Sequence, residues 1–478
     1  MKPVWRFLAV AAVLAVAVFL RTYRLNDSPP GLHADEAMDG NDALQAWRTG
    51  HYRVFYPENS GREGLFINLQ AVALGLSGGP SQWALRLPGA FVGCLTVLGL
   101  YLLVRAQISV TAAMLAGLFM ATSLWHIITS RLGTRIVAAP CFLVWTWYLL
   151  DLGCAMSQRN DRRWRWAALG GGVVLGLGFH TYTAFRVTPL LFAGVAVHLA
   201  RRLGKTAVIR VMAVATVVAL LLATPLALYG ARHPAEFWQR VDKLSVLHSA
   251  TPLADMVNIT SKTVAMYFVA GDLNERHNIP GRPMLEWPVA VLFLGGLCLA
   301  WRRHAHLYWV LTVAALPAVL ATGGIPNSMH AILTAPIVFM LAGLAGDWLA
   351  KRIETRAHRL ALPSWLAFGT TLVVLVYHNY FRRWDRDPRV ATAFDQSLLG
   401  VARRLESLPR ALPKYVILES EEVTVAGLPL GAQVLMFLTD TATPDRQEAK
   451  NLHYLWPQQT NQIALGYVYV THIETLHP

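Results

Sequence analysis

Long apolar segments recur along the whole chain and constrain its fold more than any other feature. Runs of roughly 17–25 apolar residues are long enough for a helix to cross a bilayer. The sequence predicts eleven such helices, at 4–20, 82–105, 111–129, 136–153, 165–180, 186–200, 206–229, 287–301, 306–322, 329–349 and 362–380. The expected fold class is therefore an all-α polytopic membrane protein with about 11 transmembrane helices.

Composition agrees with this class. Of the 478 residues, 55% are hydrophobic and only 15% are charged, whereas soluble proteins carry nearer a quarter charged residues. The four cysteines lie in or beside apolar segments without a CxxC spacing, so neither a disulfide framework nor a zinc site is indicated. The run at 4–20 lacks a small-x-small cleavage site, which favours a retained first helix over a signal peptide.

The formal charge of +14 is distributed as in a membrane protein rather than a nucleic-acid-binding protein. Basic residues cluster in short loops after the even-numbered apolar segments, at 105, 159–165, 201–205, 302–303 and 351–359. Such loops belong in the cytoplasm. We therefore expect a multi-pass protein of the inner or plasma membrane, with a cytoplasmic N-terminus, an extracytoplasmic C-terminus and no nucleic-acid partner.

The larger polar segments then all lie on the outer side. A transmembrane domain at 1–380 contains two of them, at 21–81 and 230–286, and a small α/β domain follows at 381–478. Within them we predict helices at 35–49, 65–76, 236–244 and 392–406, strands at 415–418 and 467–470, and a loop at 271–283. A catalytic or binding face should accordingly point outward.

Four acids follow the first apolar segment within eight residues: Asp35, Glu36, Asp39 and Asp42. On a helix that begins near Asp35, the acids at 35, 39 and 42 share one face. Acids in a first turn can simply cap the helix and offset its dipole. A carboxylate beside a bilayer can also be desolvated enough to act as a general base, and the spacing alone leaves both interpretations open.

Four arginines fall at the outer ends of apolar segments in this topology: Arg62, Arg131, Arg135 and Arg186. Arginine near a membrane surface can snorkel to the headgroups without a further role. Guanidinium groups also bind phosphate through paired hydrogen bonds. A lipid-linked phosphate is therefore the ligand that this set suggests.

The motifs together resemble those of bacterial membrane glycosyltransferases of the GT-C fold, in the superfamily of protein O-mannosyltransferases and lipid A aminoarabinose transferases (glycosyltransferase family 39-like). The similarity covers roughly 1–380 and rests on five segments taken together. They are Asp35-Glu36-Ala37, Gly61-Arg62-Glu63-Gly64-Leu65-Phe66, the stretch from Trp125 to Arg135, Thr181-Tyr182-Thr183-Ala184-Phe185-Arg186, and His277-Asn278-Ile279-Pro280-Gly281-Arg282-Pro283.

The resemblance implies transfer of a sugar from a polyprenyl-phosphate carrier to a hydroxyl acceptor (protein, lipid or glycan) on the extracytoplasmic face, with inversion at the anomeric carbon. Asp35 would be the general base and Glu36 would support it. Arg62 would place a cation on the carrier phosphate. Apart from the resemblance, their position predicts donor phosphate binding for Arg131, Arg135 and Arg186 as well. The turn formers and charges of 271–283 predict a mobile lid or substrate loop with Arg276, His277 and Arg282. No cofactor is implied.

One departure from the family pattern affects the metal. Many relatives carry a further Asp just after the Arg of the loop between the third and fourth helices, but here that stretch is Arg131-Leu132-Gly133-Thr134-Arg135-Ile136-Val137. A metal site is therefore not indicated. Two other classes stay open: a lipid or glycan transporter or flippase without transferase activity, and a non-catalytic assembly partner. Against a transporter, the chain shows no internal repeat.

Overall fold

The computed structural model describes residues 3–418, 424–425, 428–462 and 467–471. By their internal contacts these residues divide into two compact units. Unit 1 consists of Met1–Tyr23, Gly89–Arg131 and Arg135–Trp384, and unit 2 of Arg24–Pro88, Leu132–Thr134 and Asp385–Pro478. The first outer segment thus shares a unit with the C-terminal tail. The sequence-based division assigns 21–81 to the domain at 1–380, and that division of the chain at 380 stays a prediction.

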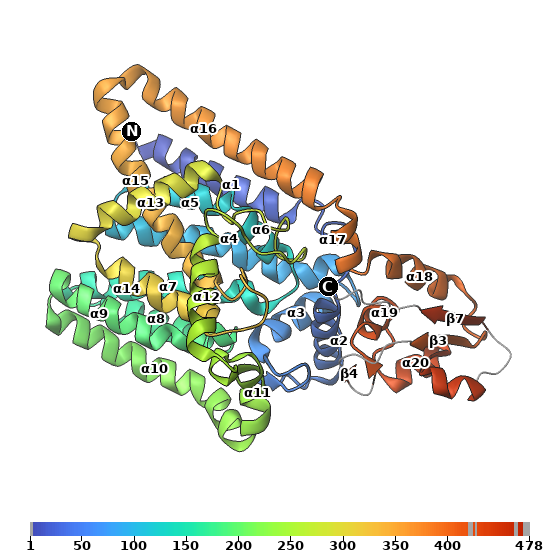
Figure 1. Cartoon of the computed structure of the whole chain (residues 1–478). Coiled ribbons are helices and arrows are strands. Elements are labelled where there is room, and N and C mark those ends of the chain that lie inside the picture. The colour runs from blue at the N-terminus through green and yellow to red at the C-terminus, as the bar shows by residue number, and fades with distance from the viewer. Residues whose placement is uncertain (1–2, 419–423, 426–427, 463–466, 472–478) are drawn as a thin grey trace. The chain divides into compact units, whose positions relative to one another are not determined.

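The secondary-structure elements described in unit 1 are helices joined by loops, with one isolated β-bridge between Ser245 and Ala321 (Figure 1). Its α-helices are α1 (Pro3–Thr22), α5 (Val110–Ala121), α6 (Leu124–Arg131), α7 (Ala138–Gln158), α8 (Trp164–Gly178), α9 (Thr188–Leu203), α10 (Lys205–Arg232), α11 (Pro234–Leu244), α12 (Pro252–Ala265), α13 (Trp287–Arg303), α14 (His306–Val319), α15 (Ala335–Arg356) and α16 (His358–His378). Helix α4 (Gln82–Gln107) begins in unit 2 and continues into unit 1. Short 3₁₀ or π segments are η1 (Arg135–Val137), η2 (Thr183–Val187), η3 (Val246–His248), η4 (Ile332–Thr334) and η5 (Asn379–Trp384).

Each of the eleven predicted apolar segments lies mostly in helix. Five helices of the described part are long and apolar enough to cross a membrane, or six if the bent pair α5–α6 is one span. The segment predicted at 111–129 as one helix is this pair, which bends by 58°. Ser123 lies at the break, where its Oγ accepts the His126 N–H at 3.3 Å. The expected number of eleven crossings stays a prediction.

Glycines let several of these helices pack closely. A Cβ at Gly172 of α8 would lie 2.6 Å from the Ala215 carbonyl oxygen of α10, and one at Gly296 of α13 would lie 2.0 Å from that of Leu341 in α15. Neither position has room for a larger residue unless the backbones move apart. Glycine therefore allows the helix backbones to approach closely at these two contacts.

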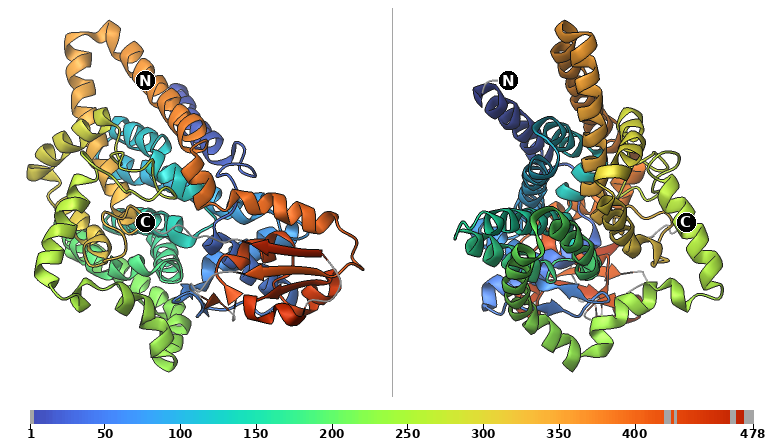
Figure 2. Two further views of the ribbon diagram at one scale, coloured as in Figure 1. Left: turned by 45° about the vertical axis from the view of Figure 1, so that its right-hand side comes forward. Right: turned by 90° about the vertical axis from the view of Figure 1, so that its left-hand side faces the viewer.

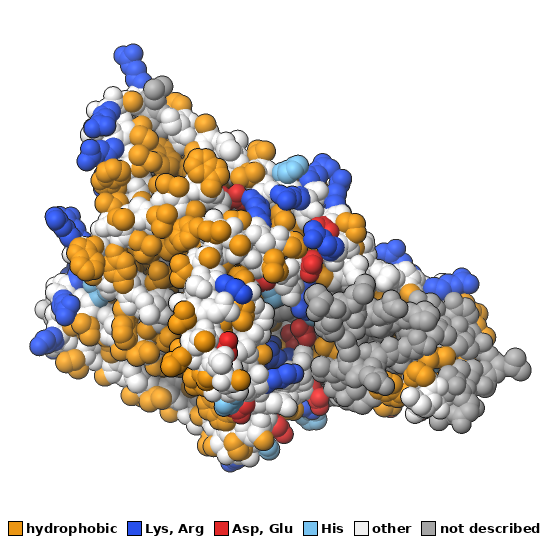
Figure 3. Space-filling view, in the orientation of Figure 1, with side chains coloured by type: hydrophobic (Ala, Val, Ile, Leu, Met, Phe, Trp, Pro, Cys, Tyr) orange, Lys and Arg blue, Asp and Glu red, His pale blue; other side chains and the backbone are white. Residues whose placement is uncertain are grey.

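The outward faces of unit 1 are apolar. Large exposed side chains include Ile209, Leu220 and Leu221 of α10 and Leu362 and Leu366 of α16. Figure 3 shows hydrophobic side chains spread broadly over the visible helices, with lysine and arginine gathered at the edges. Exposed apolar surface of this extent is what a bilayer covers.

Unit 2 combines α2 (Ala34–Thr49), α3 (Gly64–Leu76) and the hairpin β1–β2 (Phe55–Tyr56 and Arg62–Glu63) with a small α/β part. That part contains α17 (Pro388–Ala393), α18 (Gln396–Ser407), α19 (Ala432–Leu438), α20 (Pro444–Lys450), η6 (Pro457–Gln462), and strands β3 (Lys414–Leu418), β4 (Thr424–Val425), β5 (Leu428–Pro429), β6 (Leu452–Leu455) and β7 (Tyr467–Thr471). Strands β6, β3 and β7 form a parallel sheet in that order (Figure 2).

One hydrophobic core joins both parts of unit 2. It contains Leu44 of α2, Ile67 of α3 and Leu85 of α4 together with Leu435 and Phe437 of α19. Helix α19 packs on α2, where Asn41 Nδ2 donates to Gln433 Oε1 at 2.9 Å. The C-terminal domain therefore helps to hold the helix that carries the acidic cluster.

Candidate active site

Helix α2 starts and ends as its sequence predicts. His33 is the N-cap, and its Nδ1 accepts the Asp35 N–H at 3.1 Å. The His33 N–H is in turn donated to Glu36 Oε2 at 3.3 Å, which is the reciprocal arrangement of a capping box. Gly50 ends the helix with φ of 72°, a conformation that glycine adopts without strain.

Glu36 lies inside the protein. Its side chain is 1% exposed and is paired with the fully buried Arg86 of α4. Arg86 donates from Nη2 to Glu36 Oε2 at 3.2 Å and also holds the carbonyl oxygens of Pro29 and Gly31, at 3.0 and 2.7 Å. The Gly133 N–H is donated to Glu36 Oε1. These contacts indicate that Glu36 anchors the start of α2.

Arg62 is engaged by two further acids of the cluster. Its Nη1 lies 2.5 Å from Asp39 Oδ1, and its Nη2 pairs with Asp42 Oδ2. The Arg62 and Asp39 side chains are each only 3% exposed. Burial alone would lower the pKa of Arg62, but Asp39 and Asp42 outweigh it and raise that pKa above its ordinary value. Arg62 therefore stays cationic and neutralises much of the acidic face.

Asp35 differs from the other three acids. Its side chain is 46% exposed, against 1% for Glu36, 3% for Asp39 and 23% for Asp42. Asn59 Nδ2 donates to Asp35 Oδ1 at 2.7 Å, and His33 Nδ1 lies 3.6 Å from Oδ2. The most accessible acid of the cluster thus accepts from an amide. Glu36 pairs with Arg86, and Asp39 and Asp42 pair with Arg62.

The remaining predicted residues belong to unit 1. Arg131 is fully buried and links three segments: it donates to the carbonyl oxygens of Leu20 and Tyr23, at 3.0 and 2.8 Å, and to the Tyr380 hydroxyl at 2.9 Å. Its guanidinium carbon also lies 5.1 Å from the centre of the Phe381 ring. Arg131 therefore ties α6 to α1 and η5.

Arg135 and Arg186 lie against aromatic rings. The guanidinium carbon of Arg135 is 6.0 Å from the centre of the Tyr182 ring, and that of Arg186 is 4.1 Å from Phe237 and 5.4 Å from Trp238. A guanidinium group that faces a ring is attracted through its flat face, and its N–H groups lie in the plane of that face.

The segment 271–283 is a loop, as predicted, and it is folded around Asp272. Asp272 Oδ2 accepts from the Ser328 N–H and hydroxyl, both at 2.8 Å, and lies 3.1 Å from His277 Nδ1. Arg276 Nε donates to Asn274 at 3.2 Å, and Arg282 binds both oxygens of Glu286 at 2.7 and 2.6 Å. The lid role of Arg276, His277 and Arg282 stays a prediction.

Sequence reasoning did not single out Arg86, Asn59 or Asp272. Arg86 lies in an apolar stretch of the sequence, and a buried arginine needs partners. Its position in that stretch was the only feature of the sequence that pointed to a buried ion pair. Asn59 and Asp272 stand in polar segments, in which their residue types are ordinary. Among the described residues, no group of three or more His, Cys, Asp or Glu side chains is arranged to hold a metal ion.

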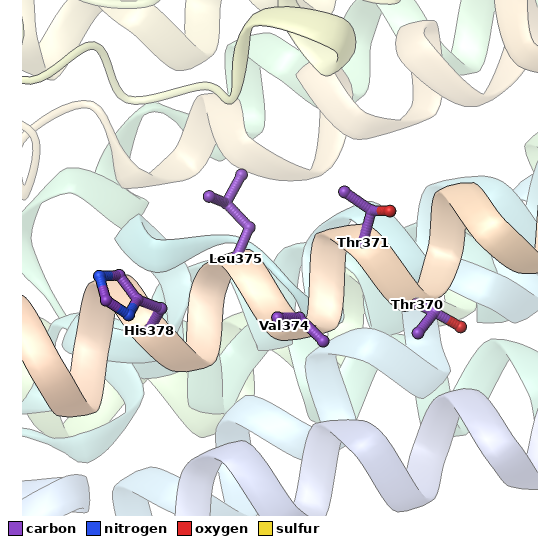
Figure 4. Close-up of a pocket in the computed structure, with 5 residues that line it drawn as sticks. All are labelled: Thr370, Thr371, Val374, Leu375 and His378. Atoms are coloured by element: carbon purple, nitrogen blue, oxygen red, sulfur yellow. The ribbon is translucent and has the colours of Figure 1, made fainter.

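A pocket of about 420 Å³ lies along α16 in unit 1 (Figure 4). All of its lining residues belong to this helix: Thr370, Thr371, Val374, Leu375 and His378. They are distinct from the residues predicted for the site. The pocket is a feature of the helix surface.

Comparison with known proteins agrees with the architecture. Residues 65–229 match the family model described as dolichyl-phosphate-mannose-protein mannosyltransferase. A comparison with curated protein sequences gives no significant match.

Among solved structures, the chain is similar to ArnT from Cupriavidus metallidurans bound to undecaprenyl phosphate, with a TM-score of 0.58 and 14% identity over 92% of this chain and 85% of that one. It is also similar to the archaeal oligosaccharyltransferase AglB from Archaeoglobus fulgidus in complex with an inhibitory peptide and a dolichol-phosphate. That match has a TM-score of 0.54 and 13% identity over 96% of this chain and 70% of that one. With its apolar helices, the chain is a multi-pass membrane protein that has the GT-C glycosyltransferase fold, which confirms the resemblance seen in its motifs.

Proposed function

We propose that the protein is an inverting glycosyltransferase that moves a sugar from a polyprenyl-phosphate carrier to a hydroxyl acceptor. The observation that carries the proposal is the exposure of the Asp35 side chain, which is 46% exposed at the start of α2. Its neighbours Glu36 and Asp39 are buried and paired with arginines. A general base must reach its substrate and must be able to take a proton. Asp35 meets both requirements better than the other three acids.

In the proposed reaction Asp35 accepts the proton of the acceptor hydroxyl as its oxygen attacks the anomeric carbon. A new C–O bond forms on one face of the sugar, and the bond from the anomeric carbon to the phosphate oxygen breaks on the other. The electron pair of that bond leaves with the carrier phosphate. The configuration at the anomeric carbon is therefore inverted.

Cations stabilise the negative charge that develops on the leaving phosphate. Phosphate binding by Arg62 would compete with two ion pairs, and by Arg131 with three hydrogen bonds. Arg135 and Arg186 rest on aromatic rings. We propose that the leaving phosphate is bound by members of this set of four arginines.

The donor class is supported by the matched structures, which contain undecaprenyl phosphate and a dolichol-phosphate. We propose that the reaction takes place on the extracytoplasmic face, with the N-terminus in the cytoplasm and the C-terminus outside, because basic loops favour the cytoplasm. Glu36 supports the reaction indirectly by fixing the start of α2. The chemistry is the same for a hexosyl or a pentosyl donor.

The test is to incubate the purified protein in detergent with polyprenyl-phosphate sugars and to measure the released carrier phosphate by mass spectrometry. Asp35→Asn should abolish release, because asparagine keeps the shape of the side chain but cannot take the proton. Asp27→Asn, which changes an exposed acid of the same outer segment, should retain full activity. Near-wild-type turnover by Asp35→Asn would refute the assignment of the base. Lipid movement by the wild-type protein without carrier release would favour a flippase.

A further inference from the structure

The turn between β1 and β2 has an unusual backbone. Strand residues Phe55 and Tyr56 pair with Glu63 and Arg62, and the connection ends in three successive residues with positive φ. These are Asn59 at 55°, Ser60 at 61° and Gly61 at 83°. Non-glycine residues in the left-handed region are uncommon, and such conformations cluster at functional sites. Two such non-glycine residues in succession mark this turn as a candidate part of the functional site.

The turn brings two side chains onto the acidic face of α2. Asn59 Nδ2 donates to Asp35 Oδ1 at 2.7 Å, and Arg62, three residues later, pairs with Asp39 and Asp42. The acids at 35, 39 and 42 form one stripe of the helix, and the hairpin contacts each of them. All of these residues lie in unit 2.

The two contacts differ in chemistry. A guanidinium group next to a carboxylate strongly favours the ionised form and makes it a poor base. An amide N–H also favours the ionised form, but it carries no net charge, so it perturbs the basicity of the carboxylate less than a guanidinium does. The hairpin thus neutralises Asp39 and Asp42 while it supports Asp35 as a usable base.

We propose that Asn59 is a positioning residue for Asp35: its amide donates to Oδ1 and thereby fixes the orientation in which the carboxylate meets the acceptor hydroxyl. This inference rests on the proposed function, because it presumes that Asp35 is the base. Asparagine suits the position for a second reason, since it tolerates the left-handed conformation better than most residues with a side chain. The same residue thus shapes the turn and holds the carboxylate.

A pair of glycine substitutions separates the amide from the turn. Asn59→Gly removes the amide and keeps a residue that adopts positive φ freely. Ser60→Gly is the matched control, because it places glycine at the neighbouring left-handed position and leaves Asn59 in place. In the carrier-release assay we expect Asn59→Gly to lower kcat on the order of tenfold to a hundredfold, as misplacement of a reacting group does. KM for the donor should change little, and Ser60→Gly should stay within about twofold of wild type.

A pH profile provides a readout that a purely structural role would not change. Loss of the amide raises the pKa of the base, so the acidic limb of the kcat profile should move to higher pH in Asn59→Gly but not in Ser60→Gly. Asn59→Asp keeps the size of the side chain and places a second carboxylate beside Asp35. It should therefore lose activity near neutral pH and regain part of it at higher pH.

Three results would overturn the inference: a wild-type kcat and pH profile in Asn59→Gly, an equal loss in Asn59→Gly and Ser60→Gly, or full neutral-pH activity in Asn59→Asp. Failure of the proposed function is distinguishable, because it would appear as an active Asp35→Asn variant. If Asn59→Gly does not fold, Asn59→Asp decides the question through its pH profile.

Discussion

Arg86 of α4 and Glu36 of α2 form a fully buried ion pair. Arg86 donates from Nε to Glu36 Oε1 at 3.4 Å and from Nη2 to Oε2 at 3.2 Å, and the two side chains are 0% and 1% exposed. Each buried charge is compensated only while its partner is present, so removal of either one destabilises the protein. Glu36 also caps the start of α2, where Asp35 lies. Loss of this ion pair should therefore both destabilise unit 2 and displace Asp35.

Glu36→Gln should therefore destabilise the protein strongly. The substitution leaves the guanidinium group of Arg86 buried without its counter-charge, and breaking a buried pair in this way typically costs about 3–5 kcal/mol. Glu406→Gln is the matched control in the same unit, since Glu406 is 44% exposed and pairs with Lys450. Exposed pairs contribute about 0–1 kcal/mol. Thermal unfolding in detergent measures both, and equal melting temperatures for the two variants would contradict the prediction.

A second prediction concerns the contact between α2 and α19. A Cβ at Gly40 would lie 2.5 Å from the Phe437 ring, and Phe437 is fully buried. Gly40→Ala should thus separate α2 from the C-terminal domain and destabilise unit 2 by about 1–3 kcal/mol, as overpacking does. It should also lower carrier release, because α2 carries Asp35.

Gly400→Ala is its control. Gly400 lies within α18 and has open space where a Cβ would be, so alanine there should be neutral or stabilising by up to about 1 kcal/mol through helix propensity. Comparison of the melting temperatures and activities of the two variants tests whether the C-terminal domain supports α2. An unaffected Gly40→Ala variant would show that it does not.

Local signals explain why α2 could be predicted from the sequence. The helix expected at 35–49 is observed at Ala34–Thr49, because its acids, its capping residue and Gly50 are neighbours in the chain. The sequence did not predict which acid is exposed, because the burial of Glu36, Asp39 and Asp42 accompanies their ion pairs with Arg86 and Arg62. The two arginines reach α2 through a hairpin and through a second helix, and neither contact has a short-range signature.

The same limit applies to the loop at 271–283. Its glycines, prolines and charges predict a loop, and that is what the chain forms. They do not reveal that Asp272 is buried and bound to Ser328, which lies in another segment. The break between α5 and α6 was likewise missed, because no proline marks it and the apolar pattern continues across it.

The topology can be tested by labelling single cysteines with a membrane-impermeant reagent in intact cells. Ser157 would be a poor probe site because it is 3% exposed, whereas Gln158 and Ser397 are exposed. In a background without the four native cysteines, Ser397→Cys should label and Gln158→Cys should be protected. The reverse pattern would place Asp35 on the cytoplasmic side and remove the basis of the proposed reaction.

The last prediction concerns Asp272 and the loop that it holds. Burial alone would raise the pKa of Asp272, but the hydrogen bonds from His277 and from the N–H groups of Ser328 and Asn274 outweigh it and lower that pKa below 3.8. A depressed carboxylate pKa stabilises the folded state at pH above the unfolded value, and this contribution is lost as the pH falls through the folded value. The loop should accordingly keep its amide-exchange protection near neutral pH and lose it only in acid, as the pH falls below the ordinary range of an aspartate pKa.

Asp272→Asn should remove the pH dependence and weaken the loop at neutral pH, because asparagine cannot supply the charge that these donors bind. The difference from the wild type should disappear as the pH falls through the folded pKa of Asp272. Trypsin should then cleave after Arg276 faster in Asp272→Asn than in the wild type at neutral pH. If the loop is also a lid, a non-hydrolysable donor analogue should slow this cleavage in both proteins, since closure over the substrate excludes the protease as it excludes water. Slowed cleavage in the wild type alone would tie donor binding to Asp272. Identical cleavage of variant and wild type would show that Asp272 does not hold the loop.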